Sequence, residues 1–240
     1  MINKNIWDRL FLKYLKSIEK DKNADFAYER LVNSLSILSL CDNVGSALDI
    51  GCGDGRFTKE LETRYSPVYG IDYSGRMLKL AKVRCKNTTF IKHDLETPLP
   101  KFDLKFDLIN CKLLLMYISD IDNLAAECFK ILNTDGLLVV SVTHPLKWII
   151  ESTKGNFENN YKGYLSEVEV GGKISKDQNL EVIFINRTFE RYVNSFTKHG
   201  FLLNTVSETG VPDAFVVKYP KYLEFQKKPY RLNLRFTKPK

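Results

Sequence analysis

The residues best suited to chemistry form a glycine-rich turn, 47–55, with the sequence Ala-Leu-Asp-Ile-Gly-Cys-Gly-Asp-Gly. The apolar run before it and the helical pattern after it predict a strand, a tight turn and a helix, which lets backbone approach a nucleotide closely. In a Gly-x-Gly-x-x-Gly dinucleotide site the third glycine would fall at Arg56. A buried Asp49 at the strand end would also repel a pyrophosphate. The turn therefore favours a ligand that carries positive charge and no phosphate.

Two further acids follow the next two predicted strands, 67–72 and 88–92. Asp72 lies 21 residues after Gly51, close to the spacing at which an acid meets ribose hydroxyls. A carboxylate there can accept two hydrogen bonds from the vicinal diol. Asp94 stands where an acid commonly accepts from the adenine amino group. The alternative for Asp94 is that it only caps the following turn.

The order of predicted elements indicates a parallel, doubly wound α/β sheet. Apolar strands over 106–111 and 137–143 complete a βαβαβαβαβ series, after a turn at 133–136. Ligands bind at the carboxyl ends of the strands in such sheets. Five residues of interest lie at those ends: Gly51, Asp72, Asp94, Cys111 and His144.

His144 is the candidate general base. It ends a core strand and its imidazole titrates near neutrality, so it could take a proton from an acceptor. The alternative is a structural role, in which His144 only hydrogen-bonds to backbone beside Pro145. No His, Cys or acid spacing indicates a metal site.

The segments that flank this core carry their own predictions. Residues 1–44 read as helices that form a lid, with Tyr14 either facing the nucleotide pocket or lying at the edge of the core. Residues 45–145 form the cofactor-binding half. Residues 146–187 read as an inserted cap with a hairpin that turns at Gly171-Gly172 and with four aromatic side chains, Trp148, Phe157, Tyr161 and Tyr164. Residues 188–240 then supply the last helix and the two terminal strands of a single domain, 1–240.

Composition limits the class of protein. The 240 residues suit one α/β domain, and the net charge of +7 indicates either an anionic partner or scattered surface lysine. The five cysteines show no paired spacing, which is typical of reduced thiols in a cytoplasmic protein. The chain has no hydrophobic signal core and no apolar run long enough to cross a membrane.

Five motifs together resemble the class I S-adenosylmethionine-dependent methyltransferases, in the small-molecule branch of the type 11 kind. The resemblance is carried by 48–55 and 69–74, and supported by 106–109, 132–140 and 198–201. It implies a Rossmann-like sheet of seven strands, the seventh antiparallel to its neighbours. It also implies S-adenosylmethionine as the methyl donor and S-adenosylhomocysteine as the product. The amino group and sulfonium of the donor fit the positively charged, phosphate-free ligand that the glycine turn favours.

The same resemblance assigns roles to residues. Asp49 and the glycine turn would hold the methionine part of the donor, Asp72 the ribose, and Asp94 with Leu95 the adenine. Asn110 and Cys111 would line the pocket beside the methyl group. The full expected cofactor set is Tyr14, Asp49, Gly51, Cys52, Gly53, Asp72, Tyr73, Met77, Asp94, Leu95, Asn110 and Cys111.

The expected activity is methyl transfer to a nitrogen or oxygen of a small metabolite, by a monomer or homodimer. Nucleic acid is an unlikely substrate, since the fourth strand lacks the Asn/Asp-Pro-Pro-Tyr/Phe signature and no Pro-Cys pair is present. Two alternatives stay open. One is an RNA methyltransferase, suggested by the basic stretch 218–240, and the other is a protein that binds S-adenosylmethionine without catalysis.

Overall fold

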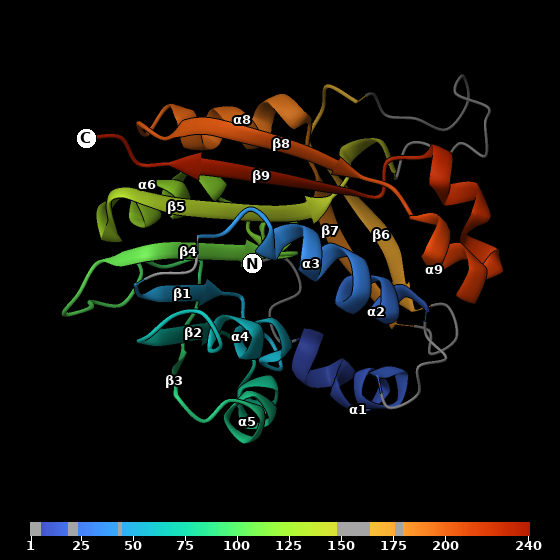
Figure 1. Ribbon diagram of the computed structural model, residues 1–240, viewed down its shortest axis with the longest axis horizontal. Coiled ribbons are helices and arrows are strands. Elements are labelled where there is room, and N and C mark those ends of the chain that lie inside the picture. Colours follow the sequence, from blue (N-terminus) through green and yellow to red (C-terminus); the bar gives the residue numbers. More distant parts are fainter. Residues whose placement is uncertain (1–5, 19–23, 43–44, 148–163, 176–179) are drawn as a thin grey trace.

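The computed structural model describes residues 6–18, 24–42, 45–147, 164–175 and 180–240 (Figure 1). Seven strands form one sheet in the order β3-β2-β1-β4-β5-β9-β8. The strands are β1 Ala47–Ile50, β2 Val68–Asp72, β3 Thr88–Lys92, β4 Phe106–Lys112, β5 Leu132–Thr143, β8 Leu202–Thr209 and β9 Arg231–Thr237. The predicted seven-stranded α/β sheet is therefore confirmed.

Strand direction follows the predicted topology. β1 to β5 pair with one another in parallel, whereas β9 is antiparallel to both β5 and β8. Parallel neighbours need crossover connections, and helices supply most of these between β1 and β5. The single antiparallel strand that the resemblance implies is β9.

Helices cover both faces of the sheet, because alternate residues of a strand point to opposite faces. α6 and α8 pack on the face that includes Ile109 and Val140, and α3 and α4 pack on the face that includes Leu108 and Val139. The doubly wound arrangement is confirmed (Figure 1). The helices named here are α1 Ile6–Ile18, α2 Ala24–Tyr28, the π-helical turn η1 Glu29–Asn33, α3 Ser34–Leu38, α4 Arg56–Leu61, α5 Gly75–Arg84, the 3-10 turn η2 Leu115–Tyr117, α6 Ile121–Ile131, α8 Phe189–Thr197, α9 Asp213–Lys218 and the 3-10 helix η3 Pro220–Lys227.

The N-terminal helices lie against the carboxyl ends of the strands. Asp8 of α1 accepts hydrogen bonds from the Ser74 hydroxyl and from the Arg76 backbone N–H, so α1 is held at the start of α5. Ser74 is also the N-cap of α5, since its side chain accepts from the Met77 N–H. The start of α5 is therefore fixed from two sides.

The predicted hairpin is present as a separate two-stranded sheet, but the predicted turn is wrong. β6 (Val168–Ser175) continues through Gly171-Gly172 and pairs with β7 (Leu180–Asn186), so these glycines lie opposite Ile183 and Val182. Pairing with β7 holds both glycines in the strand although glycine weakens strand interiors, and the sequence signal alone does not show this pairing. Trp148, Phe157 and Tyr161 lie outside the described residues. The Tyr164 hydroxyl accepts a hydrogen bond from the Phe189 N–H at the start of α8.

The turn predicted at 133–136 lies inside β5. Register passes from Phe106↔Leu132 to Leu108↔Leu137, so β5 gains residues relative to β4 and bulges there. Asp135 has φ 60, and a Cβ on Gly136 would lie 2.8 Å from the Asn133 carbonyl oxygen. The Asn-Thr-Asp-Gly sequence thus bends a strand instead of separating two elements.

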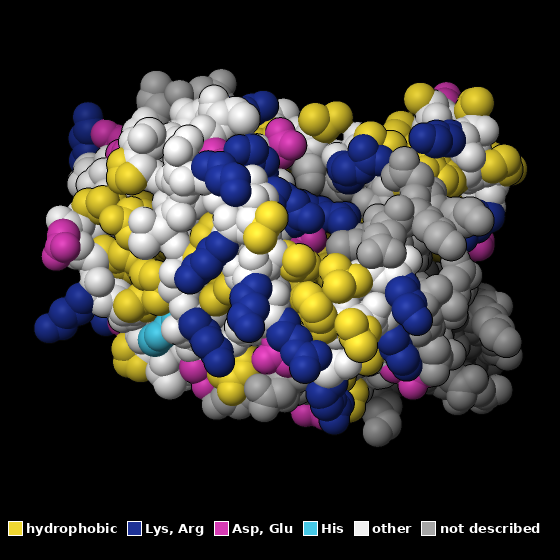
Figure 2. Space-filling view, turned by 90° about the horizontal axis from the view of Figure 1, so that it is seen from below, with side chains coloured by type: hydrophobic (Ala, Val, Ile, Leu, Met, Phe, Trp, Pro, Cys, Tyr) yellow, Lys and Arg dark blue, Asp and Glu magenta, His cyan; other side chains and the backbone are white. Residues whose placement is uncertain are grey.

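Basic side chains are spread over the face seen in Figure 2, where Lys and Arg lie among hydrophobic and acidic side chains. The interleaving agrees with the scattered-lysine interpretation of the +7 charge for this face.

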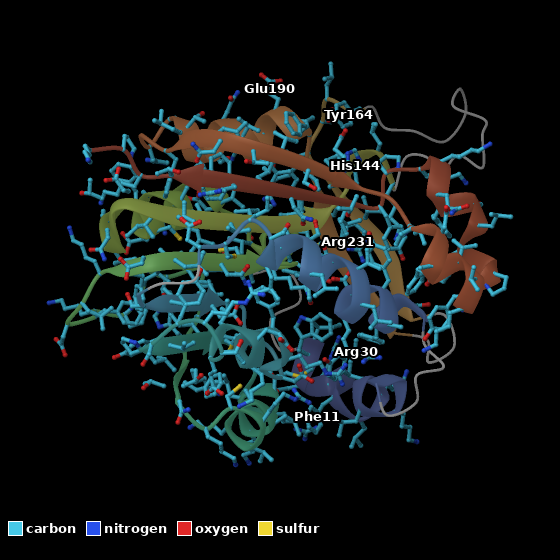
Figure 3. All side chains as sticks on the ribbon, viewed as in Figure 1. Phe11, Arg30, His144, Tyr164, Glu190 and Arg231 are labelled. Atoms are coloured by element: carbon cyan, nitrogen blue, oxygen red, sulfur yellow. The ribbon has the colours of Figure 1, made fainter. Side chains whose placement is uncertain are left out.

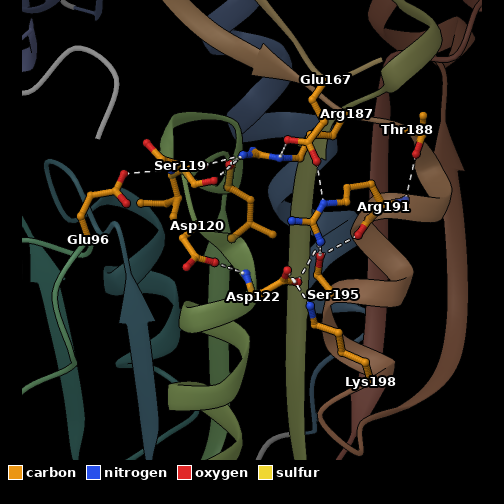
Figure 4. A network of polar contacts seen from close by, with 12 residues as sticks. Glu96, Ser119, Asp120, Asp122, Glu167, Arg187, Thr188, Arg191, Ser195 and Lys198 are labelled. Atoms are coloured by element: carbon orange, nitrogen blue, oxygen red, sulfur yellow. Dashed lines mark hydrogen bonds and ion pairs between the residues drawn. The ribbon is translucent and has the colours of Figure 1, made fainter. Parts of the chain in front are cut away.

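A buried arginine joins the hairpin to the segment after β4. Arg187 donates to the carbonyl oxygens of Leu115 (2.9 Å), Ile118 (2.8 Å) and Ser119 (3.0 Å), and to the Glu167 carboxylate (3.0 Å) (Figure 4). Its side chain is fully buried, and its hydrogen bonds to Leu115 and Ile118 satisfy carbonyls that are buried with it. Arg187 therefore fixes η2.

We expect Arg187→Met to lower the free energy of unfolding by at least about 2 kcal/mol, because buried carbonyls left without donors cost about 1–3 kcal/mol each. The control Lys130→Met removes an exposed pair with Glu127 and should cost under about 0.5 kcal/mol. Urea unfolding followed by circular dichroism measures both. Equal costs for the two variants would contradict the assigned role of Arg187.

Candidate cofactor site

A cavity of about 560 Å³ lies where β1, β2 and β4 end, bounded by α1 and η1. Its volume falls in the range of small-molecule sites. The glycine turn supplies part of the wall, Asp49 and Asp72 supply carboxylates, and the aromatic residues Trp7, Tyr14 and Phe26 line the cavity as well. The position is the carboxyl edge of a parallel sheet, as the sequence predicts.

The glycine turn takes its shape from left-handed backbone. Gly51, Gly53 and Gly55 have φ values of 75°, 54° and 76°, a region that glycine enters without steric cost. A Cβ at Gly53 would meet nothing within 4 Å, so the backbone here faces open space in the cavity wall. A Cβ at Gly55 would lie 2.9 Å from Ala81, so that glycine is required for α5 to pack against the turn.

Asp72 is oriented by backbone on both sides. One carboxylate oxygen accepts from the Gly53 N–H at 2.9 Å and the other from the Ser74 N–H at 2.8 Å. Burial raises the pKa of Asp72, and these N–H groups oppose that shift. Each carboxylate oxygen retains a lone pair for a further donor. Asp72 is therefore a fixed acceptor pair at the edge of the cavity.

Asp49 is buried among three elements. Its oxygens accept from the Thr58 hydroxyl of α4 at 2.6 Å and from the Asn110 amide of β4 at 2.7 Å. Burial raises the pKa of Asp49 to about 6, although both hydrogen bonds oppose the shift. A desolvated carboxylate beside a cavity favours a cationic ligand.

The structure brings nine of the predicted cofactor residues together on the cavity wall: Tyr14, Asp49, Gly51, Cys52, Gly53, Asp72, Tyr73, Met77 and Leu95. Three others lie behind or beside it. Asn110 stands behind Asp49, and Cys111 points into the core on the α6 face, because adjacent strand residues face opposite ways. Asp94 accepts from the Glu96 N–H, as the capping alternative requires. The cofactor roles of all twelve stay predictions.

Both ring nitrogens of His144 have partners. Nδ1 accepts from the Leu146 N–H at 3.2 Å, so Nε2 carries the hydrogen and donates to the Glu208 carboxylate at 2.7 Å. The ring is buried, and it does not belong to the described lining of the cavity. This is the backbone contact that the structural alternative foresaw, and the catalytic role of His144 stays a prediction.

Charged residues outside the predicted cofactor set also line the cavity, among them Asp8, Glu29, Arg30, Arg56, Arg84 and Lys112. Glu29 belongs to the helical segment that the sequence predicts as a lid. Lys112 ends the strand that also holds Asp107 and Asn110, and its charge at the carboxyl end of a core strand is the signal that could have singled it out. Leu113 follows it with φ 53, rare for a branched side chain. That backbone lets Lys112, Leu113 and Leu114 all line the cavity, whereas a regular strand would turn the middle residue away.

Comparison with known proteins matches residues 48–140 to the family described as "Methyltransferase domain". A demethylmenaquinone methyltransferase of Tropheryma whipplei is 34% identical over 106 residues, which are 42% of this chain and 44% of that protein. A crystal structure of an S-adenosylmethionine-dependent methyltransferase from Mesorhizobium loti is 25% identical, with TM-score 0.70 over 85% of this chain and 96% of the other. The N-methyltransferase NodS of Bradyrhizobium japonicum, crystallised with S-adenosylhomocysteine, shares the fold at 17% identity and TM-score 0.55, over 87% of this chain and 86% of the other.

Residues 48–140 match a methyltransferase domain, and the chain has the fold of S-adenosylmethionine-dependent methyltransferases. S-adenosylmethionine is the methyl donor of those enzymes. The match spans under half the length of the demethylmenaquinone methyltransferase. Within the described segments no helix is long and apolar enough to span a membrane, and no group of three or more His, Cys, Asp or Glu could hold a metal ion. All five cysteines are buried, and none of them forms a disulfide.

We expect the stability of the ligand-free protein to depend on pH through Asp49. Its pKa is about 6 in the folded state against an ordinary 3.8, so the folded state binds more protons between these values. The free energy of unfolding should therefore fall as pH rises through that window. The fall should be at most about 3 kcal/mol, because the two pKa values differ by about two. Asp49→Asn should remove this part of the dependence, as urea unfolding at pH 5 and pH 7.5 will measure. An unchanged pH dependence in the variant would contradict the pKa assigned to Asp49.

Proposed function

We propose that the protein transfers a methyl group from S-adenosylmethionine to a nitrogen or oxygen of a small-molecule acceptor. The observation that carries the proposal is that the buried Asp49 carboxylate, the half-buried Asp72 carboxylate and open glycine backbone all line one cavity. The demethylmenaquinone methyltransferase, named for a small-molecule substrate, supports the acceptor class. So does the cavity volume of about 560 Å³, which suits small ligands.

The cavity fits the donor on two counts. Gly53 leaves room for close approach to backbone, and Asp72 keeps free lone pairs that suit a ribose diol. Asp49 would face the positively charged end of the donor, and Met77 with Leu95 would give an apolar wall for the adenine. When bound, the donor supplies an electrophilic methyl group. The chain aligns the acceptor and excludes water from it.

The N-terminal helix takes part in this enclosure. Trp7, Asp8 and Tyr14 of α1 line the cavity, and the Trp7 and Tyr14 rings meet edge to face at 6.2 Å. Because Asp8 fixes α1 to the start of α5, the aromatic wall and the Asp72 end of the site are held together. We propose that α1 acts as the lid that the sequence predicts.

Asp72→Ala should weaken S-adenosylhomocysteine binding about 10- to 150-fold, because a hydrogen bond to a charged group contributes about 1.5–3 kcal/mol. Asp103→Ala, which removes an exposed carboxylate, is the control and should bind like the unmodified protein. Isothermal titration measures both affinities, and thermal melting checks that each variant is folded. Unchanged affinity in Asp72→Ala would refute the ribose role.

We propose that His144 holds the end of β5 through Glu208 and does not take the acceptor proton. His144→Gln should then lower the melting temperature and leave turnover within about threefold. Steady-state kinetics with a methyl-acceptor found in a metabolite extract tests this. A loss of about 10²–10⁴-fold in turnover, with donor affinity retained, would instead establish His144 as the general base.

A further inference from the structure

A row of polar residues crosses one face of the sheet beside the cavity. Lys112 pairs in register with Ser141, and Ser141 pairs with Asn233, so their side chains share a face. Arg231 lies two residues before Asn233 on the same face. The opposite face of these strands is apolar. η1 and α3 cover the polar row, through Asn33 to Ser141 and Asn233 to Ser36.

Glu29 of η1 is the carboxylate in this row, and it is engaged with Arg231. One oxygen of Glu29 accepts from the guanidinium Nε and Nη2 atoms, each at 2.6 Å. The other accepts from the Asn33 amide at 2.8 Å. Burial alone would raise the pKa of Glu29, but Arg231 and Lys112 hold it below its ordinary value. Glu29 is therefore ionised, and its charge is directed mainly at Arg231, which is labelled in Figure 3.

Lys112 makes its hydrogen bonds to neutral oxygens. Nζ donates to the Ser34 hydroxyl at 2.8 Å and to the Glu29 backbone carbonyl at 3.4 Å, whereas the Glu29 carboxylate is 3.7 Å away. The side chain is only 16% exposed. Arg231 and Lys112 thus share the Glu29 carboxylate unequally, and burial lowers the pKa of Lys112 although the nearby Glu29 and Asp49 carboxylates oppose that shift.

Lys112 belongs to the cavity wall, which carries other charged side chains as well, among them Asp54, Arg56, Lys59, Glu60 and Arg84. Lys112, Glu29 and Arg30 line it, and the Phe57 ring lies 5.3 Å from the Lys112 ammonium. Beyond Lys112 the wall is apolar and aromatic, with Leu113 and with Tyr117, whose ring lies 6.0 Å from that of Trp7. A cation at one end and an aromatic wall beside it match an acid with a hydrophobic or planar carbon skeleton.

We propose that Lys112 binds a carboxylate of the acceptor, so that the substrate is an organic acid or a molecule that carries an acidic group. The inference rests on the proposed methyl transfer and names the acceptor class. Ser34 and the Glu29 carbonyl hold the ammonium in place, and Arg231 neutralises Glu29 so that Lys112 remains available to the ligand. The aromatic wall is the reason to assign the carboxylate to the acceptor and not to the donor.

The test is a titration of the protein saturated with S-adenosylhomocysteine, using benzoate, phenylacetate and succinate, each beside its neutral amide. At least one acid should bind about tenfold or more tightly than its amide, as expected for hydrogen bonds to a charged group. Lys112→Met should abolish this preference and Lys112→Arg should preserve it, because Arg keeps the charge. Lys130→Met, an exposed lysine on α6, should behave like the unmodified protein.

Three results would overturn the proposal. One is equal binding of acids and amides by the unmodified protein across the panel, a comparison that needs no variant to fold. The second is an acid preference that survives in Lys112→Met. The third is a Lys112→Met variant that binds S-adenosylhomocysteine weakly but binds 5′-methylthioadenosine normally. Because 5′-methylthioadenosine lacks the carboxylate of the donor, this result would assign Lys112 to the donor carboxylate. Failure of the unmodified protein to bind S-adenosylhomocysteine would instead contradict the proposed function itself.

Discussion

Two carboxylates held in a desolvated position are the constraint on which the rest of the site depends. Burial raises the pKa of both Asp49 and Asp72, so each costs stability when it is ionised in the ligand-free protein. The fold tolerates them because Thr58 and Asn110 donate to Asp49, and two backbone N–H groups donate to Asp72. These donors come from α4, β4, the glycine turn and the start of α5, so the carboxylates of β1 and β2 also determine how these parts must meet. A ligand that offers positive charge and hydroxyl donors offsets the cost of keeping these two carboxylates ionised.

Much of the fold and of the cavity wall could be predicted from local sequence. The glycine turn, the acid that ends β2 and the alternation of strands and helices are determined over short distances along the chain. They led to the doubly wound sheet and, with the family resemblance, to the seven strands, the antiparallel strand and nine residues of the cavity wall, whereas the order of the strands in the sheet was not predicted. Strand periodicity also explains why Cys111 points into the core and does not line the cavity. It neighbours Asn110, and successive strand residues face opposite ways, so the two could not line the same pocket.

The remaining features depend on distant parts of the chain. Glu29 and Arg231 are 202 residues apart, and only the finished fold shows that one carboxylate is shared by two cations. The role of Gly171-Gly172 depended on which strand lay opposite. Two adjacent glycines are compatible with a turn and with extended backbone, and only the pairing with β7 distinguishes these. His144 illustrates the same limit. The sequence places His144 at a strand end, but only the finished fold shows that Glu208, from β8, lies on its Nε2 atom.

A crystal structure of the protein with S-adenosylhomocysteine tests the central claim most directly. The account predicts that the ligand occupies the cavity at the ends of β1, β2 and β4, with its ribose hydroxyls on Asp72 and its amino group on the side of Asp49. The Lys112 ammonium should remain beside unoccupied space for an acceptor. A ligand bound elsewhere, or one whose ribose has no contact with Asp72, would contradict the account.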